Sequence, residues 1–254
     1  MEFPDVFLVA GLIFVVAGLV KGLVGFGLPA LSLGLLTLIM GHQTAITLIL
    51  VPSLVTNFWQ AFSGGYLSAL VKRLWLFLVL AAVTVWAGAL VLTRLQDGWS
   101  ETLLGSLFIL YALPGLAGLQ PRLSPSAERW LAVPLGLLNG LFTGLTGTFN
   151  FPGVIYFQSL GLNRDELVQA MGLLFLISTV ALWLSLSRVG YLEADQLGPS
   201  IVMMLPTFIG VYVGQRFRKG LSDKAFRRVV LATILGLGLY LLATGLPVML
   251  GHTA

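Results

Sequence analysis

Cysteine is absent from this 254-residue chain, and charged residues make up only 9% of it. The lack of cysteine excludes disulfides, catalytic thiols and thiolate metal sites. Only two histidines are present, His42 and His252, so we expect neither an imidazole metal site nor a serine hydrolase triad. The chain also contains no Walker A motif and no dinucleotide-binding fingerprint, which argues against direct use of ATP and against an enzyme.

Acidic residues are missing from the interior of every long apolar stretch of the sequence. The ten that exist lie outside these stretches or, in the case of Asp5, at the start of the first one: Glu2, Asp5, Asp97, Glu101, Glu128, Asp165, Glu166, Glu193, Asp195 and Asp223. We therefore expect no buried carboxylate relay for protons. Backbone carbonyls could still hold sodium, so neither H+ nor Na+ is excluded as an ion that this chain binds.

Apolar residues dominate the composition, at 57% of the chain with a mean hydropathy of +0.98. A soluble domain of this length could not bury so much apolar surface, so the solvent must be lipid. The run 3–20 begins beside the acidic residues Glu2 and Asp5, with no basic residue before it, and precedes no cleavage site, so we expect a retained span and not a signal peptide. The apolar runs cover residues 3–20, 23–40, 45–62, 74–92, 103–119, 131–142, 154–162, 167–186, 201–213 and 229–250.

The two halves of the chain repeat one another. Residues 18–29, GLVKGLVGFGLP, return in altered form at 140–152 as GLFTGLTGTFNFP. Further along, Trp59 corresponds to Trp183, with small loop insertions explaining the drift in spacing. The sequence predicts two transmembrane repeats, 1–120 and 126–250, packed as one membrane domain and joined by a short linker at 121–125.

Loop charge predicts that the repeats are inverted, because Lys and Arg near span ends stay in the cytoplasm. Lys72 and Arg73 make one loop basic, whereas the equivalent loop of the second half carries Arg188 and two acidic residues. The next loop reverses this bias, with Arg94 in the first half and six basic residues at 216–228 in the second. Five crossings per half would place equivalent loops on opposite sides and both termini outside. Four crossings plus a re-entrant element would give parallel repeats and lose this segregation.

The predicted fold is thus an all-α integral membrane protein with two inverted repeats of about five hydrophobic segments each. We expect 8–10 transmembrane helices, some of them broken or half-length at Gly/Pro breaks, because the runs 131–142 and 154–162 are short against the ~20 residues of a full span. The basic loops set topology and do not indicate a nucleic-acid partner.

Two Gly/Pro breaks, at 21–29 and 143–152, indicate the substrate site. Irregular backbone at membrane depth is tolerated only inside protein or around a wet cavity, and a helix that restarts there presents free N–H groups and a positive dipole end to an anion. The alternative is glycine used for close helix packing, as at Gly22 to Gly25 and Gly140 to Gly144. The predicted substrate-binding residues are Lys21, Gly25, Gly27, Asn57, Gln60, Thr146, Gly147, Thr148 and Asn150.

Alternative roles remain for the polar members of this set. Each neutral side chain can instead form a helix-to-helix hydrogen bond. Lys21, expected to offset the charge of an anion, can instead extend to the cytoplasmic surface.

Three stretches resemble one transporter family. They are KGLVGFGLPALSLGLLTLIMG from Lys21, ILVPSLVTNFWQAFSGG ending at Gly65, and GLFTGLTGTFNFPGVIYFQSLGLNRDE ending at Glu166. Together with the duplication they resemble the TauE/SafE sulfite exporter family, also called the toluene sulfonate uptake permeases. This resemblance implies a permease of the bacterial inner membrane for sulfite, sulfonates, sulfoacetate or related small organic anions.

The sequence therefore predicts a secondary permease that works by alternating access, with its site between the two breaks. An anion channel is the first alternative, and a membrane sensor or enzyme subunit the second. Expected partners are a small anionic substrate and membrane lipid, and the sequence leaves open whether H+ or Na+ is a coupling ion. No cofactor is expected, and a homodimer is compatible with the sequence. Export of a net negative charge gains about 2.3 kcal/mol per 100 mV, but the sequence leaves the direction of transport open.

Overall fold

The computed structural model describes residues 3–96, 98–119, 122–148, 151–192, 197–217 and 223–251. All regular secondary structure in these residues is helical. The first half holds α1 (Phe3–Val24), α2 (Leu28–Met40), α3 (His42–Phe62), α4 (Leu67–Leu92) and α5 (Trp99–Leu116). The second half holds α6 (Pro125–Thr146), α7 (Gly153–Gln158), α8 (Arg164–Arg188), α9 (Leu197–Val202), α10 (Met204–Phe217) and α11 (Asp223–Met249).

Six stretches of the described chain are long and apolar enough to cross a membrane, so this is an all-helical, multi-pass membrane protein. Lipid solvates their outer faces, and each helix satisfies its own backbone hydrogen bonds. The six are Val6–Val24, His42–Phe62, Leu67–Leu92, Arg164–Arg188, Leu197–Phe217 and Arg227–Met249.

Short helices follow both breaks. After α1 ends at Val24, α2 runs for only 13 residues, and after α6 ends at Thr146, α7 runs for only 6. Gly27 and Gly147 take left-handed backbone angles at these turns, with φ of 101° and 71°, which glycine adopts without strain. The short apolar run 131–142, which we expected to form a half-length helix, instead lies inside the 22-residue α6. The first turns of α6 contain polar residues, so the apolar run covers only part of the helix.

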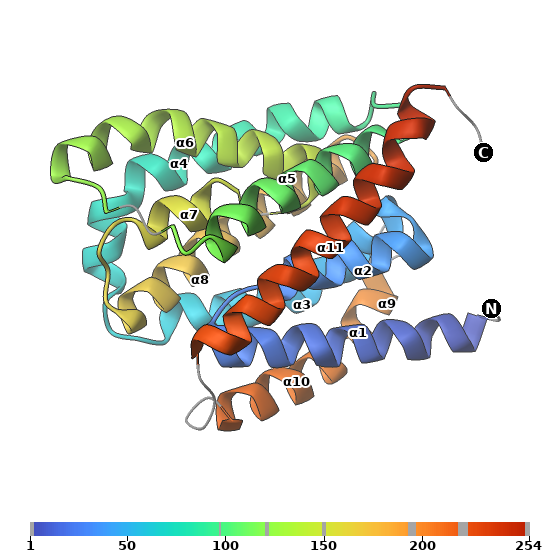
Figure 1. Cartoon of the computed structure of the whole chain (residues 1–254), viewed down its shortest axis with the longest axis horizontal. Helices are drawn as coiled ribbons and strands as arrows, with labels where there is room; N and C mark the ends of the chain where they lie inside the picture. Colours follow the sequence, from blue (N-terminus) through green and yellow to red (C-terminus); the bar gives the residue numbers. More distant parts are fainter. Residues whose placement is uncertain are drawn as a thin grey trace.

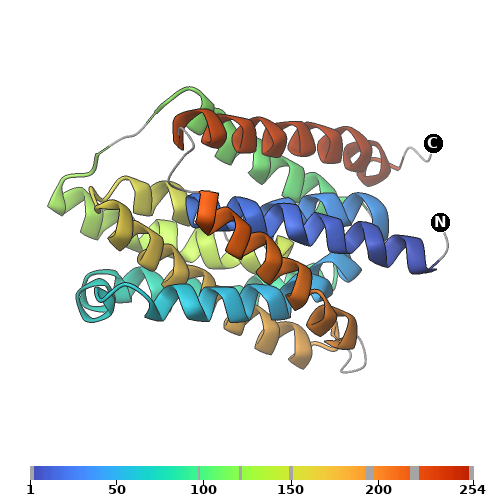
Figure 2. The same ribbon diagram turned by 90° about the horizontal axis from the view of Figure 1, so that it is seen from below.

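The centre of the bundle is formed by α3 and α8, which pack against each other. Within the apolar windows, 72% of α3 and 61% of α8 is buried, against 28–50% for the other four spanning stretches. Around this pair, α1 packs along α10 and α4 packs along α6, as Figure 1 shows for α1 with α10. The pair α5 and α11 lies along one edge of the bundle (Figure 2).

The start of α1 and the end of α11 lie at the same end of the bundle (Figure 1). The helix α6 begins at the opposite end. Charge is almost entirely excluded from the interior: among the side chains that the structure describes, Lys21 is the only buried one with a formal charge at neutral pH. That one exception draws attention to the end of α1.

Candidate functional site

Lys21 lies in the last turn of α1 and is only 5% exposed. Its Nζ donates a hydrogen bond to Thr56 Oγ1 at 3.0 Å and another to Asn57 Oδ1. Within the described residues, no carboxylate oxygen lies within ion-pair distance of it. The side chain therefore does not extend to the surface, and the ammonium keeps one of its three N–H donors for another acceptor.

A cavity of about 330 Å³ adjoins Lys21 between α1, α3, α8 and α10. Hydrogen-bonding side chains on its wall include Ser63, Tyr66 and Gln215. Asp165, which is exposed in the first turn of α8, also lines it. The cavity is thus polar, holds one buried cation, and has its carboxylate on an exposed part of the wall. We call it the Lys21 cavity.

Gln60 ties the first break to α8. Its Nε2 donates to the carbonyl oxygen of Gly25 at 2.7 Å and to that of Val168 at 2.6 Å. Gln60 has only two amide hydrogens, so both are committed. This is the helix-to-helix hydrogen bonding that the sequence left open as its alternative role. Gln60 and Gly25 line the Lys21 cavity, but Gln60 holds its wall and has no N–H left to donate to a ligand.

Asn57 extends the network from α3 to α8. Its Nδ2 lies 3.5 Å from Thr179 Oγ1, at the limit of a hydrogen bond, and it accepts from Lys21 through Oδ1. Thr56 gives its own hydroxyl proton to the carbonyl of Pro52 at 2.7 Å, so its oxygen is free to accept from Lys21. Sequence reasoning missed Thr56, although it is adjacent to Asn57 and was therefore within reach.

Of the second break, no residue that the structure describes lines the Lys21 cavity. Thr146 and Thr148 are both buried, and the Thr148 backbone N–H points to Thr146 Oγ1 at 3.4 Å. The Thr148 hydroxyl has no partner. Gly147 packs against Ile46 of α3, where an added Cβ would lie 2.8 Å from Ile46 Cγ1. Asn150 lies outside the described residues, so its predicted role stays a prediction.

Asn139 is a second residue that sequence reasoning missed. It is fully buried on α6, and its Oδ1 accepts a hydrogen bond from the Gly153 N–H at the start of α7, at 3.0 Å. Its Nδ2 has no partner. The Gly153 N–H at the start of α7 is thus bonded to Asn139. The sequence had predicted that N–H groups at this break would be free to bind an anion. A lone amide inside the apolar run 131–142 was the available signal.

The remaining glycines of the two motifs serve helix packing. A Cβ on Gly18 would lie 2.5 Å from the Thr207 carbonyl oxygen of α10, and one on Gly144 would lie 2.6 Å from the Ala89 nitrogen of α4. By contrast, Gly25 and Gly27 have left-handed angles, with φ of 88° and 101°. The motif therefore combines both interpretations: its early glycines pack helices, and its later ones turn the chain.

A second polar cavity, of about 710 Å³, lies at the other end of α3. It is lined by His42, Gln43, Glu101 and Tyr191, among others, and shares no lining residue with the Lys21 cavity. His42 is buried with neither ring nitrogen partnered. His42 and Gln60 are separated by about 27 Å along the helix, at ~1.5 Å per residue. We call this second space the His42 cavity.

Comparison with curated proteins and with solved structures gives no match. The model of one protein family, described as sulfite exporter TauE/SafE, matches residues 10–241. That range runs from α1 into α11 and includes both breaks and every described residue of the Lys21 network. The family is one of membrane transporters and not of enzymes. On this match across most of its length, the chain belongs to the sulfite exporter TauE/SafE family.

Proposed function

We propose that the chain is a secondary permease that carries a small sulfur or organic oxyanion by alternating access and binds it beside Lys21. Sulfite, a sulfonate, sulfoacetate or a related carboxylate fits this class. The observation that carries the proposal is the buried ammonium of Lys21, which has no carboxylate partner in the described part of the chain. A charge buried in a membrane domain is costly and typically marks a substrate or ion pathway.

The wall of the Lys21 cavity supports an anionic ligand. One N–H of Lys21 remains for it, and the hydroxyls of Ser63 and Tyr66 and the amide of Gln215 line the same space. Hydrogen bonds to an ionised oxygen are shorter and stronger than neutral ones. At about 330 Å³ the cavity is at the lower end of the range for small-molecule sites, which suits a small oxyanion.

The two cavities support alternating access. They lie at opposite ends of α3, and the buried middle of the helix separates them, including Ile46, Ile49 and Leu50. A channel would need a continuous path, whereas a carrier exposes one end at a time. We infer that the structure represents a conformation in which the site opens beside Ser63 and Asp165, and that the His42 cavity is the vestibule of the opposite conformation.

Exchanged helix pairs support inverted repeats. In the first half α1 packs along α10, and in the second half its counterpart α6 packs along α4. Gly22 meets Gly214 in one pair, and Gly144 meets Gly88 in the other, and these are matching positions in the sequence repeat. Because α1 and α6 also begin at opposite ends of the bundle, we infer that the halves are related by an axis in the membrane plane, as in many carriers.

Basic residues indicate the orientation. Lys72, Arg73 and Arg129 line one cavity together with the first residues of α6. Arg94, just after α4, and Arg188, the last residue of α8, instead adjoin residues that line the His42 cavity at the other end of the bundle. By the positive-inside rule the end at which α6 begins is cytoplasmic. The Lys21 cavity then opens inward, both termini lie outside, and the membrane is a bacterial inner membrane. An anion leaving the cell through this site gains about 2.3 kcal/mol per charge per 100 mV.

Anion binding by the purified protein tests the proposal. We expect sulfite, sulfoacetate or toluene sulfonate to raise its melting temperature in a dose-dependent way, because a ligand of the folded state stabilises it by mass action. Lys21→Ala should abolish the shift, and Lys21→Arg should retain part of it. Arg94→Ala, which removes an exposed positive charge at the other end, should leave the shift unchanged.

Transport into proteoliposomes then separates the mechanisms. A carrier moves the labelled anion at a rate that saturates with anion concentration. It also exchanges labelled anion for unlabelled anion on the far side of the membrane. A voltage-dependent current far above carrier turnover would instead show a channel. In the melting experiment, a rise in melting temperature with carboxylates that contain no sulfur, and with no other anion, would overturn the sulfur substrate. An anion-induced rise that survives in Lys21→Ala would overturn the site.

A further inference from the structure

A third polar cavity, of about 660 Å³, lies away from both transport cavities. It is formed where α4 and α6 begin, with α7 behind them, and shares no lining residue with the Lys21 cavity. The residues that matter for its chemistry are Lys72, Arg73, Trp75, Glu128, Arg129 and Tyr156.

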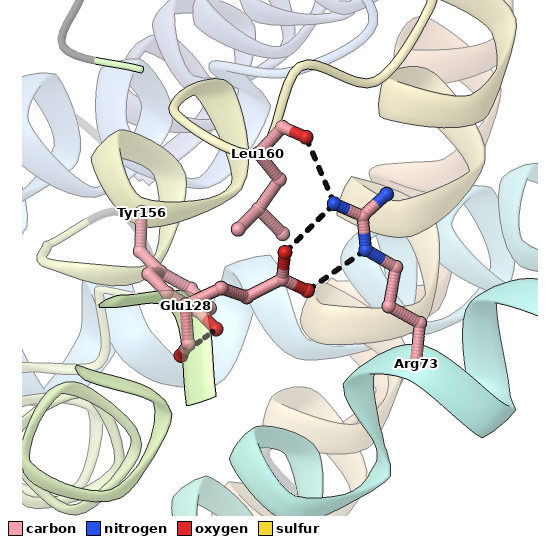
Figure 3. Close-up of polar contacts among 4 residues, drawn as sticks. All are labelled: Arg73, Glu128, Tyr156 and Leu160. Carbon is pink, nitrogen blue, oxygen red and sulfur yellow. Dashed lines mark hydrogen bonds and ion pairs between the residues drawn. The ribbon is translucent and has the colours of Figure 1, made fainter. Parts of the chain in front are cut away.

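One cation of this cavity is already paired. Arg73 Nε donates to Glu128 Oε1 and Arg73 Nη2 to Glu128 Oε2, both at 2.8 Å, and Nη2 also reaches the Leu160 carbonyl oxygen at 2.9 Å. Figure 3 shows the guanidinium facing the carboxylate in this two-point pairing. Such bidentate pairs fix geometry as well as charge. Both carboxylate oxygens of Glu128 thus accept from Arg73, and the two charges offset one another.

Two further cations remain without an acidic partner. Within the described residues, no carboxylate lies within ion-pair distance of Lys72 or Arg129, and both side chains are exposed. Glu166, the other acidic side chain near Arg73, accepts from the Asn163 backbone N–H at 2.9 Å and so caps α8. The cavity therefore has a surplus of two positive charges on its open side.

The back wall of the cavity is held rigidly. The Tyr156 hydroxyl donates to the Glu128 carbonyl oxygen at 3.0 Å, and the Tyr156 ring stacks on Phe77 with centroids 4.9 Å apart and planes 7° apart. These contacts join α4, α6 and α7. The wall is preformed, so a ligand that binds here need not order it.

Tryptophans place the cavity at a membrane surface. Trp75 lines it at 56% exposure, and Trp130, next to Arg129, is 82% exposed. Trp is typical of the depth at which lipid headgroups meet acyl chains. Lys72 and Arg129 are close to the starts of α4 and α6, while apolar Leu76 and Ala132 line the cavity one turn further along. A negatively charged group could thus contact Lys72 and Arg129, and the first part of an acyl chain could contact Leu76 and Ala132.

We propose that this cavity binds the phosphodiester headgroup of an anionic membrane lipid, with Lys72 and Arg129 as the phosphate-binding residues and Trp75 as a wall for the glycerol backbone. Basic pockets between helix ends are a known type of lipid headgroup site. A volume of about 660 Å³ with an apolar inner part exceeds what a free inorganic anion fills. This site is independent of the transport proposal, since it includes no residue of the Lys21 network.

Lipid titration of the full-length protein in detergent tests the site. Native mass spectrometry and melting temperature would be followed with phosphatidylglycerol, with phosphatidylcholine of the same chains, and with inorganic phosphate. We expect phosphatidylglycerol to form discrete adducts and stabilise the protein, with the other two giving neither effect. Lys72→Gln combined with Arg129→Gln should weaken phosphatidylglycerol binding tenfold or more, and Lys72→Arg combined with Arg129→Lys should retain it.

Arg94→Gln combined with Arg188→Gln is the matched control, because it removes two exposed positive charges from the opposite end. Its lipid binding should equal that of the parent chain. If the Lys72/Arg129 variant is less stable without lipid, Trp75→Ala tests the same wall with the charges in place and should weaken binding. Equal binding of phosphatidylcholine, full binding by the Lys72/Arg129 variant, or equal stabilisation by inorganic phosphate would each overturn the lipid site.

Discussion

At the scale of single residues, we expect the folded state to depend on the hydrogen bonds of Gln60. Its two amide hydrogens bond to Gly25 O and Val168 O. Gln60→Glu replaces both donors with a carboxylate facing two carbonyl oxygens, so it should lower the free energy of unfolding by about 2 kcal/mol or more. Melting of the purified variant measures this loss.

Gln43→Glu is the control for that change. Gln43 Nε2 makes one exposed hydrogen bond, to the Tyr191 carbonyl oxygen at 3.2 Å. An exposed group can bond to water when its partner is lost, so the same substitution should cost well under about 1 kcal/mol here. Equal losses at both positions would contradict the role assigned to Gln60.

The sequence could single out Lys21 because a cation in a break between two apolar runs is rare in a membrane protein and so carries information. Thr56 and Asn139 give a weaker signal, because a neutral polar residue in an apolar run is common. A hydroxyl or amide in an apolar helix often bonds to its own backbone four residues earlier, as Thr56 does to Pro52. Whether such a side chain also forms a hydrogen bond to another helix depends on how the helices pack, and a local sequence pattern does not contain that information.

At the scale of helices, the glycine contacts predict a contrast within α1. A Cβ on Gly22 would lie 2.9 Å from Gln215 N on α10, whereas one on Gly11 would meet nothing within 4 Å. Gly22→Ala should therefore separate the two helices and destabilise the protein by about 1–3 kcal/mol. Gly11→Ala should leave stability unchanged or raise it by up to about 1 kcal/mol, because alanine favours helix.

Gly144→Ala extends this test to α6, where the added Cβ would lie 2.6 Å from the Ala89 nitrogen of α4. If the halves are related by symmetry, Gly22→Ala and Gly144→Ala should cost similar amounts in the same unfolding experiment. A large loss at Gly144 with none at Gly22 would argue against equivalent roles for the two helix pairs.

Helix existence was predictable from sequence because long apolar runs report directly on the lipid solvent. Helix length was less so: the run 131–142 lies in a helix that starts at Pro125, where Ser124 caps it by accepting from Ala127 N at 3.3 Å. Capping and polar first turns extend a helix beyond its apolar part. The same sequence pattern also could not separate packing glycines from turning glycines, since both share one motif.

At the scale of the whole molecule, the absence of cysteine makes access to the two cavities measurable. Ser63→Cys places one thiol in the Lys21 cavity, and Thr244→Cys places one in the His42 cavity. In the conformation described, we expect a small hydrophilic maleimide to label both positions, each only from its own side of the membrane. Ser126→Cys, exposed and outside both cavities, controls for general reactivity.

Substrate should shift the two labelling rates in opposite directions. A ligand that stabilises one state of a two-state carrier depletes the other, and the buried stretch of α3 from Ile46 to Leu50 prevents both cavities from reaching the site at once. The Ser126→Cys rate should not change. Labelling of both cavity cysteines from a single side, unaffected by substrate, would mean that the path is continuous and that the protein is a channel.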